Sequence, residues 1–115
     1  MASKNAVDKV VDALEIRDLN AHLSSVTDCK QAASVKIVYR SNLNQVVNIQ
    51  IQGSMTENFA QSWNIGSAVA VPAGNVTEQL NYEPADEVFP YMRVSSKCGV
   101  APGSGSLDVY FDKQK

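Results

Sequence analysis

Residues 89–111 of the chain read FPYMRVSSKCGVAPGSGSLDVYF. An aromatic-led run is followed by a turn rich in proline, glycine and serine, and then by a second run that alternates apolar and polar residues. Two such runs separated by a turn predict paired strands, so we expect the chain to end in a β-hairpin with residues 101–106 as its exposed tip. The residues of this hairpin predicted to close the core are Phe89, Tyr91, Leu107, Val109 and Phe111.

The same two-residue period extends upstream. Val35, Ile37 and Tyr39 share one face of an expected strand, and apolar residues alternate with asparagine and glutamine across residues 47–52. Such alternation is typical of antiparallel strands that bury one face and expose the other. Further extended segments are expected at residues 21–26, 59–65, 68–71 and 76–82. About seven to eight short strands, with no second helix for parallel crossovers, predict a mainly β fold: a single antiparallel β-sandwich or jelly roll.

The N-terminal segment follows a different period. Four apolar residues fall at the i, i+3, i+4, i+7 spacing that predicts one stripe of a helix: Val7, Val10, Val11 and Leu14. A helix this short is marginal alone and must pack on the sheet of its own chain or on a neighbouring subunit. We therefore expect residues 1–18 to form an N-terminal helical arm and residues 19–115 to form the β-sandwich domain.

The length and net charge of the chain limit the classes of protein to which it could belong. The 115 residues are enough for one domain with a modest core. The net charge of -2 and the pI of about 5.2 lack the basic excess of proteins that bind nucleic acid through its phosphates. No apolar run approaches the ~20 residues that cross a bilayer, and residues 1–18 lack a signal-peptide pattern. We expect neither a nucleic-acid nor a membrane partner, and synthesis in a cytoplasm.

Few residues of the sequence carry recognisable chemistry. His22 is the single histidine, and with Cys29 and Cys98 it offers too few clustered ligands for a structural metal site. We expect the two cysteines to be free thiols, since synthesis in a cytoplasm argues against a disulfide. The alternative is a disulfide, which requires folding to bring their Cα atoms within about 7 Å. The acidic residues within 83–87 lack the ordered spacing of a calcium loop and predict a solvated acidic loop. We expect the protein not to be an enzyme and to use no cofactor.

The aromatic residues allow two interpretations. Trp63, Tyr82, Phe89 and Tyr91 would form a platform for sugars if their rings were exposed. Alternatively, Trp63 and Phe89 fill the core, since aromatic side chains dominate core burial. We favour the core placement, and keep Trp63 and Tyr82 as the candidate ligand platform.

Several short runs follow one another in an order found in a known class of proteins. They are IQIQGS at residues 49–54, WNIGS at 63–67, PAG at 72–74, FPYMRV at 89–94 and APGSGSLDV at 101–109. This order resembles small β-sandwich virion proteins of tailed bacteriophages and related viruses. The resemblance implies a non-enzymatic structural role as a head decoration, head-fibre or tail component. It also implies partners among other virion proteins and further copies of the chain, and a protein made in the host cytoplasm and carried in the virion.

Two functions follow from these observations. The favoured function is a viral structural protein that assembles through protein–protein contacts, with the four apolar residues of the N-terminal arm touching the next subunit. Outward-facing amides fit the polar rim of such an interface: Asn48, Gln50 and Gln52. The alternative is a carbohydrate- or ligand-binding β-sandwich, in which Trp63 and Tyr82 would contact a glycan.

Overall fold

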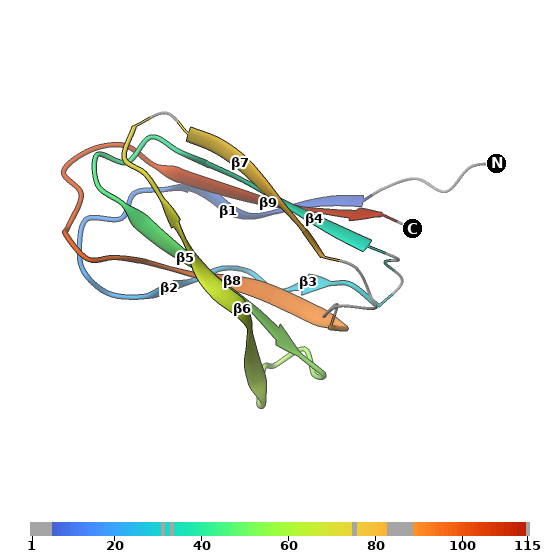
Figure 1. The fold of residues 1–115 in the computed structure, drawn as a ribbon. Helices are drawn as coiled ribbons and strands as arrows, with labels where there is room; N and C mark the ends of the chain where they lie inside the picture. Colours follow the sequence, from blue (N-terminus) through green and yellow to red (C-terminus); the bar gives the residue numbers. More distant parts are fainter. Residues whose placement is uncertain (1–5, 31, 33, 75, 83–88, 115) are drawn as a thin grey trace.

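The computed structural model describes residues 6–30, 32, 34–74, 76–82 and 89–114. These residues form two antiparallel sheets that pack face to face (Figure 1). The first sheet has the order β1-β9-β4-β7. Its strands are β1 (Ala6–Leu14), β9 (Leu107–Gln114), β4 (Ser34–Ser41) and β7 (Val76–Tyr82).

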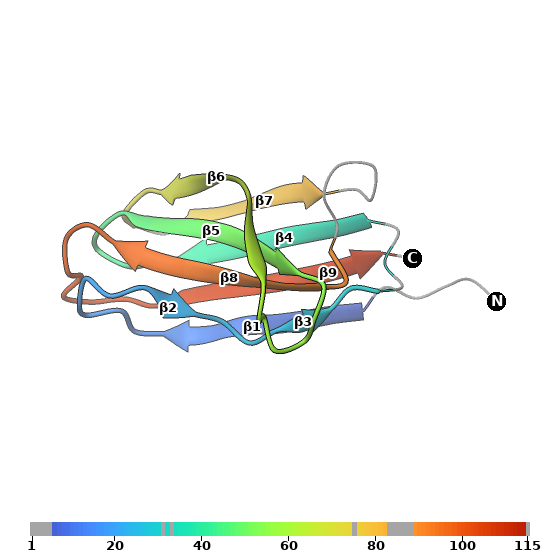
Figure 2. The same ribbon diagram turned by 90° about the horizontal axis from the view of Figure 1, so that it is seen from below.

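The second sheet has the order β2-β8-β5-β6, and β3 also pairs with β8. Its strands are β2 (His22–Leu23), β3 (Thr27–Asp28), β8 (Tyr91–Cys98), β5 (Val47–Ser54) and β6 (Ser62–Val71). Figure 2 shows β1, β2 and β3 along one side of the sandwich, with β6 and β7 along the opposite side.

The strand order is that of a jelly roll. Because β2 and β3 both pair with β8, they act as one interrupted edge strand. Counted this way, eight strands alternate between the sheets along the chain, except that β5 and β6 are neighbours in the same sheet. Eight strands in two such sheets are the jelly-roll arrangement of paired Greek keys. The prediction of a mainly β antiparallel sandwich is therefore confirmed.

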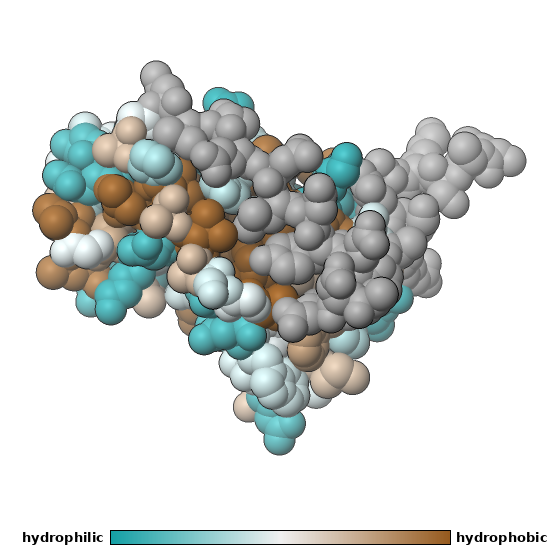
Figure 3. All heavy atoms as spheres, in the orientation of Figure 1, coloured by the Kyte–Doolittle hydropathy of each residue, from teal (hydrophilic) through white to brown (hydrophobic). Residues whose placement is uncertain are grey.

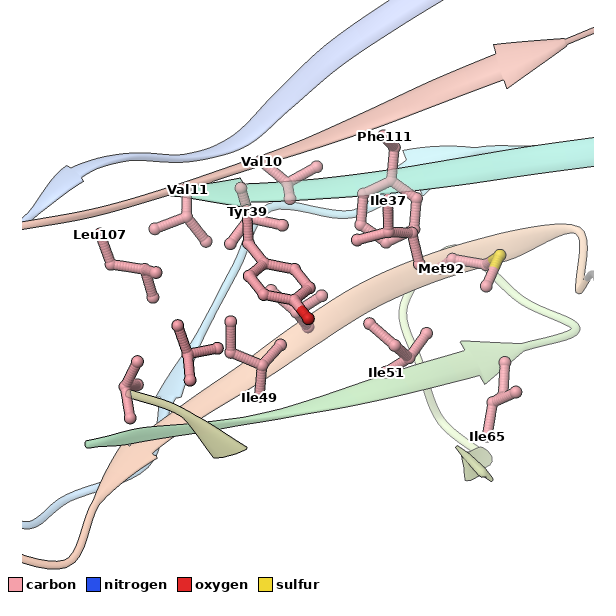
Figure 4. Close-up of a cluster of buried hydrophobic side chains, with 14 of the residues drawn as sticks. Val10, Val11, Ile37, Tyr39, Ile49, Ile51, Ile65, Met92, Leu107 and Phe111 are labelled. Carbon is pink, nitrogen blue, oxygen red and sulfur yellow. The ribbon is translucent and has the colours of Figure 1, made fainter. Parts of the chain in front are cut away.

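The core lies between the two sheets, as the alternation predicts. Val35, Ile37 and Tyr39 of β4 are buried, and so are the apolar residues of β5 that alternate with asparagine and glutamine. Figure 4 shows side chains from both sheets pointing into the space between them. The fully buried large side chains include Tyr39, Phe111, Ile37, Ile49, Ile51, Ile65, Met92 and Leu107.

The prediction of an N-terminal helix is wrong, because residues 6–14 form the edge strand β1, which pairs with β9. The ladder of β1 has register shifts between Lys9 and Val11 and between Val11 and Leu14, and Ala13 has a φ of 48°. A bulge inserts an extra residue, so neighbouring residues can both face the core. Val10 and Val11 are accordingly only 6% and 5% exposed. The bulged strand thus reproduces a spacing that, read alone, indicates a helix.

The prediction that the chain ends in a β-hairpin is also wrong. β8 and β9 lie in different sheets, so residues 99–106 connect one sheet to the other. Sheets pack about 10 Å apart, a gap that eight residues cross with ease. The backbone amide of Asn42 donates to the carbonyl of Ser106 over 3.0 Å, and Gly103 N donates to Asn44 Oδ1 over 2.8 Å. These bonds hold the connection against residues 42–44, so it is not a free tip.

The inward face of β8 is offset by one residue from the prediction. Met92 and Val94 are fully buried, whereas Tyr91 is half-buried on the outer face. Phe89 is partly buried and packs against the core. The three core residues predicted in the last strand are confirmed as fully buried: Leu107, Val109 and Phe111.

Candidate functional site

Four exposed apolar residues lie in β1, in β2 and in the segments that flank β2, along one side of the sandwich. We call this surface the β1–β2 side and define it by its exposed apolar residues, Val7, Leu19, Leu23 and Val26. Their exposed fractions are 60%, 52%, 57% and 37%. The amide of Ser25 donates to the carbonyl of Val10 over 3.3 Å, which ties the β2–β3 segment to β1. Val7 pairs with Asp112 and lies on the outer face of the first sheet, whereas Leu23 pairs with Ser95 and lies on the outer face of the second, so the exposed apolar residues of this side point to different faces.

The four residues predicted to form an assembly arm differ in how deeply they are buried. Val10 and Val11 are in the core, and Leu14 is half-buried against it. Val7 alone of these four is exposed among the described residues. A role of the N-terminal segment in assembly stays a prediction, and Val7 is the residue positioned to serve it. The sequence analysis did not select Leu19 and Leu23 as site residues. Each is a leucine flanked by polar residues, and that pattern could have indicated an exposed apolar side chain.

A polar cluster fixes β1 at this side. Lys113 Nζ of β9 donates to Asp8 Oδ2 over 2.8 Å and to the carbonyl of Asp28 over 2.9 Å. The buried Thr27 hydroxyl donates to the same Asp8 oxygen. The bonds from Lys113 and Thr27 favour the carboxylate and hold the pKa of Asp8 below its usual range. The cluster therefore joins β1, β3 and β9.

The β5–β6 pair carries a bulge that a glutamine side chain fills. Ile49 pairs with Val69 and Ile51 pairs with Ile65, so Gln50 faces three residues of β6, 66–68. Gln50 Nε2 lies 3.2 Å from the carbonyl oxygen of Ile65. It also lies 3.3 Å from that of Gly66, whose φ is 66°. The side chain thus satisfies backbone acceptors that the bulge removes from the ladder.

Beside the bulge, three polar side chains form a row across the outer face of the second sheet. Gln52 Nε2 donates to Asn64 Oδ1 over 3.1 Å, and Arg93 Nε donates to Gln52 Oε1 over 2.9 Å. We call Asn64, Gln52 and Arg93 the amide row. The Arg93 guanidinium lies 4.1 Å from the ring centroid of Phe59, so the β5–β6 connection folds back over it. This cation–π contact explains why Phe59 is nearly buried outside any strand.

Trp63 lies at the surface, so its assignment to the core is wrong. Its side chain is 46% exposed and stacks on Phe89, with ring centroids 5.6 Å apart. Phe89 in turn lies against the Cα of Gly53, where an added Cβ would come within 2.5 Å of the ring. Successive side chains of a strand point to opposite faces, so Trp63 and Asn64 of the amide row do not share a surface. The Tyr82 side chain lies outside the described part of the chain.

The described residues offer little reactive chemistry. They contain no group of three or more histidine, cysteine or acidic residues placed to hold a metal ion. His22 Nε2 lies 2.8 Å from Asp18 Oδ1 at the surface. Cys29 and Cys98 are free and buried, and burial raises the pKa of the Cys29 thiol to about 11. The acidic loop predicted at residues 83–87 lies outside the described residues. No described helix is long and apolar enough to cross a membrane.

Comparison with known proteins identifies a shared fold. No family model and no curated protein matches the chain. Among solved structures, the PBSX exported protein XepA matches with a TM-score of 0.61 and 15% identity over 95% of this chain, which spans 37% of XepA. PirA matches with a TM-score of 0.53 and 9% identity over 97% of this chain and 95% of PirA. A CBM4 structure matches at 0.49, with 16% identity over 96% of this chain and 69% of that one. At these identities, the likeness to XepA and PirA shows a common β-sandwich fold.

Proposed function

We propose that the chain is a non-enzymatic structural component of a phage particle, such as a capsid decoration or a head or tail component, that assembles through protein–protein contacts. The observation that carries this proposal is the β1–β2 side, where two sheet edges present four exposed apolar residues. Other molecules of a particle that packed along this side would cover these exposed apolar side chains. Its partners would be other virion proteins and further copies of the chain.

The fold and the sequence resemblance also bear on the proposed function. Jelly rolls occur in viral capsid proteins and also in lectins, so the fold is compatible with more than one function. The runs at residues 49–54 and 89–94 resemble those of small virion proteins. One solved protein that shares the fold is the PBSX exported protein XepA. The sequence resemblance favours a phage origin for the chain, and the fold is compatible with it.

The proposal is tested by placing a charge on the β1–β2 side. Leu23→Asp introduces a carboxylate into the apolar contact, and we expect it to lower incorporation into particles at least about tenfold, since an unpaired buried charge is strongly disfavoured. Val100→Asp is the matched control, because Val100 is 59% exposed but lies in the connection between β8 and β9. The readout is the amount of protein that co-sediments with purified particles. Equal incorporation of both variants would argue against the β1–β2 side as the contact.

A second candidate function is carbohydrate or ligand binding. The exposed Trp63 ring and the amide row favour it, because aromatic faces and planar amide or guanidinium groups orient small polar ligands. Binding to a glycan array that disappears in Trp63→Ala, with the circular dichroism spectrum unchanged, would support this function. Binding lost in Arg93→Ala but retained in Trp63→Ala would place the ligand on the amide row instead. A protein that binds none of the glycans rules out this candidate for the sugars tested.

A further inference from the structure

The strand β6 is an unusual sheet edge. It is the outermost strand of the second sheet, paired with β5 on one side, and no other described strand lies along its far side. Its ten residues, SWNIGSAVAV, include neither a charged residue nor a proline. An edge strand carries backbone donors and acceptors that await another strand, and proteins commonly block such edges with charge, proline or brevity. β6 has none of these three protections, although a bulge interrupts its ladder at residues 66–68, as register shifts interrupt that of β1.

The other edges are protected. β1 contains Asp8, Lys9 and Asp12 and has two register shifts in its ladder. β2 and β3 are two residues each. β7 has a glutamate at position 78. β6 therefore stands apart from every other described edge of the sandwich.

The C-terminal half of β6 is the accessible part. The bulge filled by Gln50 lies at residues 66–68, between the ladder of residues 62–65 and the ladder of residues 69–71. Residues 66–71, the bulge and the ladder after it, form the second segment of the strand. In the second segment, Ala68 and Ala70 are exposed and Val69 is half-buried. Figure 3 shows apolar surface over the upper part of the line that β6 takes in Figure 1, and pale to hydrophilic surface over its lower end. A strand approaching this edge would meet small, uncharged side chains, and no strand in the described part of the chain occupies it.

We propose that a second copy of the chain adds its own β6 antiparallel to residues 66–71, so that the second sheet continues across two molecules. A two-fold axis near Val69 would set Ala68 opposite Ala70 of the other copy, which places small side chains together and no charge against a like charge. The edge is thus self-complementary, as a two-fold interface requires. Backbone hydrogen bonds supply the attraction, as in other cases of strand addition. This inference rests on the proposed assembly function and names one of its contacts.

The test uses the full chain in solution. Sedimentation velocity over a concentration series should show a monomer–dimer equilibrium. Amide hydrogen exchange at residues 66–71 should slow as the dimer fills, while exchange in β1 stays constant. The double variant Ala68→Lys/Ala70→Lys sets like charges opposite each other and should raise the dimer dissociation constant at least about tenfold. Mixing it with Ala68→Glu/Ala70→Glu should restore association as a mixed dimer.

The matched control is Ala60→Lys/Ala101→Lys, which adds the same charge at two exposed alanines outside β6 and should leave the dimer intact. A monomer at every concentration, or a dimer indifferent to the lysines in β6, would overturn the inference. The exchange measurement on the unmodified chain decides the matter even if a variant fails to fold. Particles that contain the chain while β6 stays unpaired would refute this contact and leave the proposed function standing.

Discussion

The side-chain amide of Gln50 in β5 donates to the carbonyl of Ile65 in β6 over 3.2 Å, across the bulge that divides the edge strand. The bond shows that the bulge is a specified feature, because a side chain is positioned to replace the missing ladder bonds. It also fixes the register of both halves of β6, one of which is the proposed pairing segment.

Gln50→Leu should destabilise the fold by about 1–3 kcal/mol, because it keeps the size of the side chain but leaves the carbonyls of Ile65 and Gly66 without their donor. Chemical denaturation monitored by Trp63 fluorescence measures the loss. Asn48→Leu is the control, since Asn48 is an exposed amide on the same face of β5 away from the bulge. A loss no larger than that of the control would mean that the Gln50 bonds contribute nothing to stability.

Gly53→Ala should cost about 1–3 kcal/mol by overpacking, because the new methyl group would meet the Phe89 ring at 2.5 Å. The displaced ring should also disturb its stack with Trp63, so the emission maximum of the tryptophan should shift. Gly99→Ala is the matched control, as a Cβ at Gly99 has no atom within 4 Å. Similar stability of the two variants would contradict the close approach of Phe89 to β5.

Asp8→Asn should destabilise the protein by about 0.5–1 kcal/mol at pH 7, a modest value because the carboxylate is partly exposed. The folded-state pKa of Asp8 is lowered, so its stabilisation is present above the unfolded value of 3.8 and is lost as the pH falls through the folded value. The stability difference from the unmodified protein should therefore shrink as the pH falls below 3.8. A gap for Asp8→Asn that stays constant with pH would contradict the assignment.

Cys29 should resist thiol reagents in the folded protein at pH 8. Burial raises its pKa from 9.0 to about 11, which lowers the thiolate fraction about a hundredfold and adds to the steric protection. Mass spectrometry after brief maleimide treatment should find Cys29 unmodified in the native state and modified in denaturant. Rapid native labelling would indicate that the segment around β3 opens easily.

The sequence predicted the sandwich where its period was undisturbed. Val35, Ile37 and Tyr39 alternate without interruption and were placed correctly, as was the strand of residues 47–52. The prediction failed where geometry departs from a regular strand. Bulges in β1 set Val10 beside Val11 in the core and imitated a helical stripe.

Long-range partners were the second limit. Nothing in residues 99–106 distinguishes a hairpin turn from a crossing between sheets, because the bonds that hold this connection come from Asn42 and Asn44, far away in the sequence. Trp63 is predicted in the core because aromatic side chains dominate core burial, whereas its ring stacks on Phe89 and stays 46% exposed. The candidate surfaces depend on which strands lie at the sheet edges. That order is set by long-range strand pairing, which the sequence pattern does not show.

The central claim, that the chain is a structural component of a phage particle, is tested most directly by density-gradient fractionation of particles induced from cells that encode it. Quantitative mass spectrometry of the fractions should find the protein at a fixed ratio to the major capsid protein, in the particle band and after high-salt washing. Recovery of the protein solely in the soluble fractions at the top of the gradient, with intact particles below, would contradict the claim.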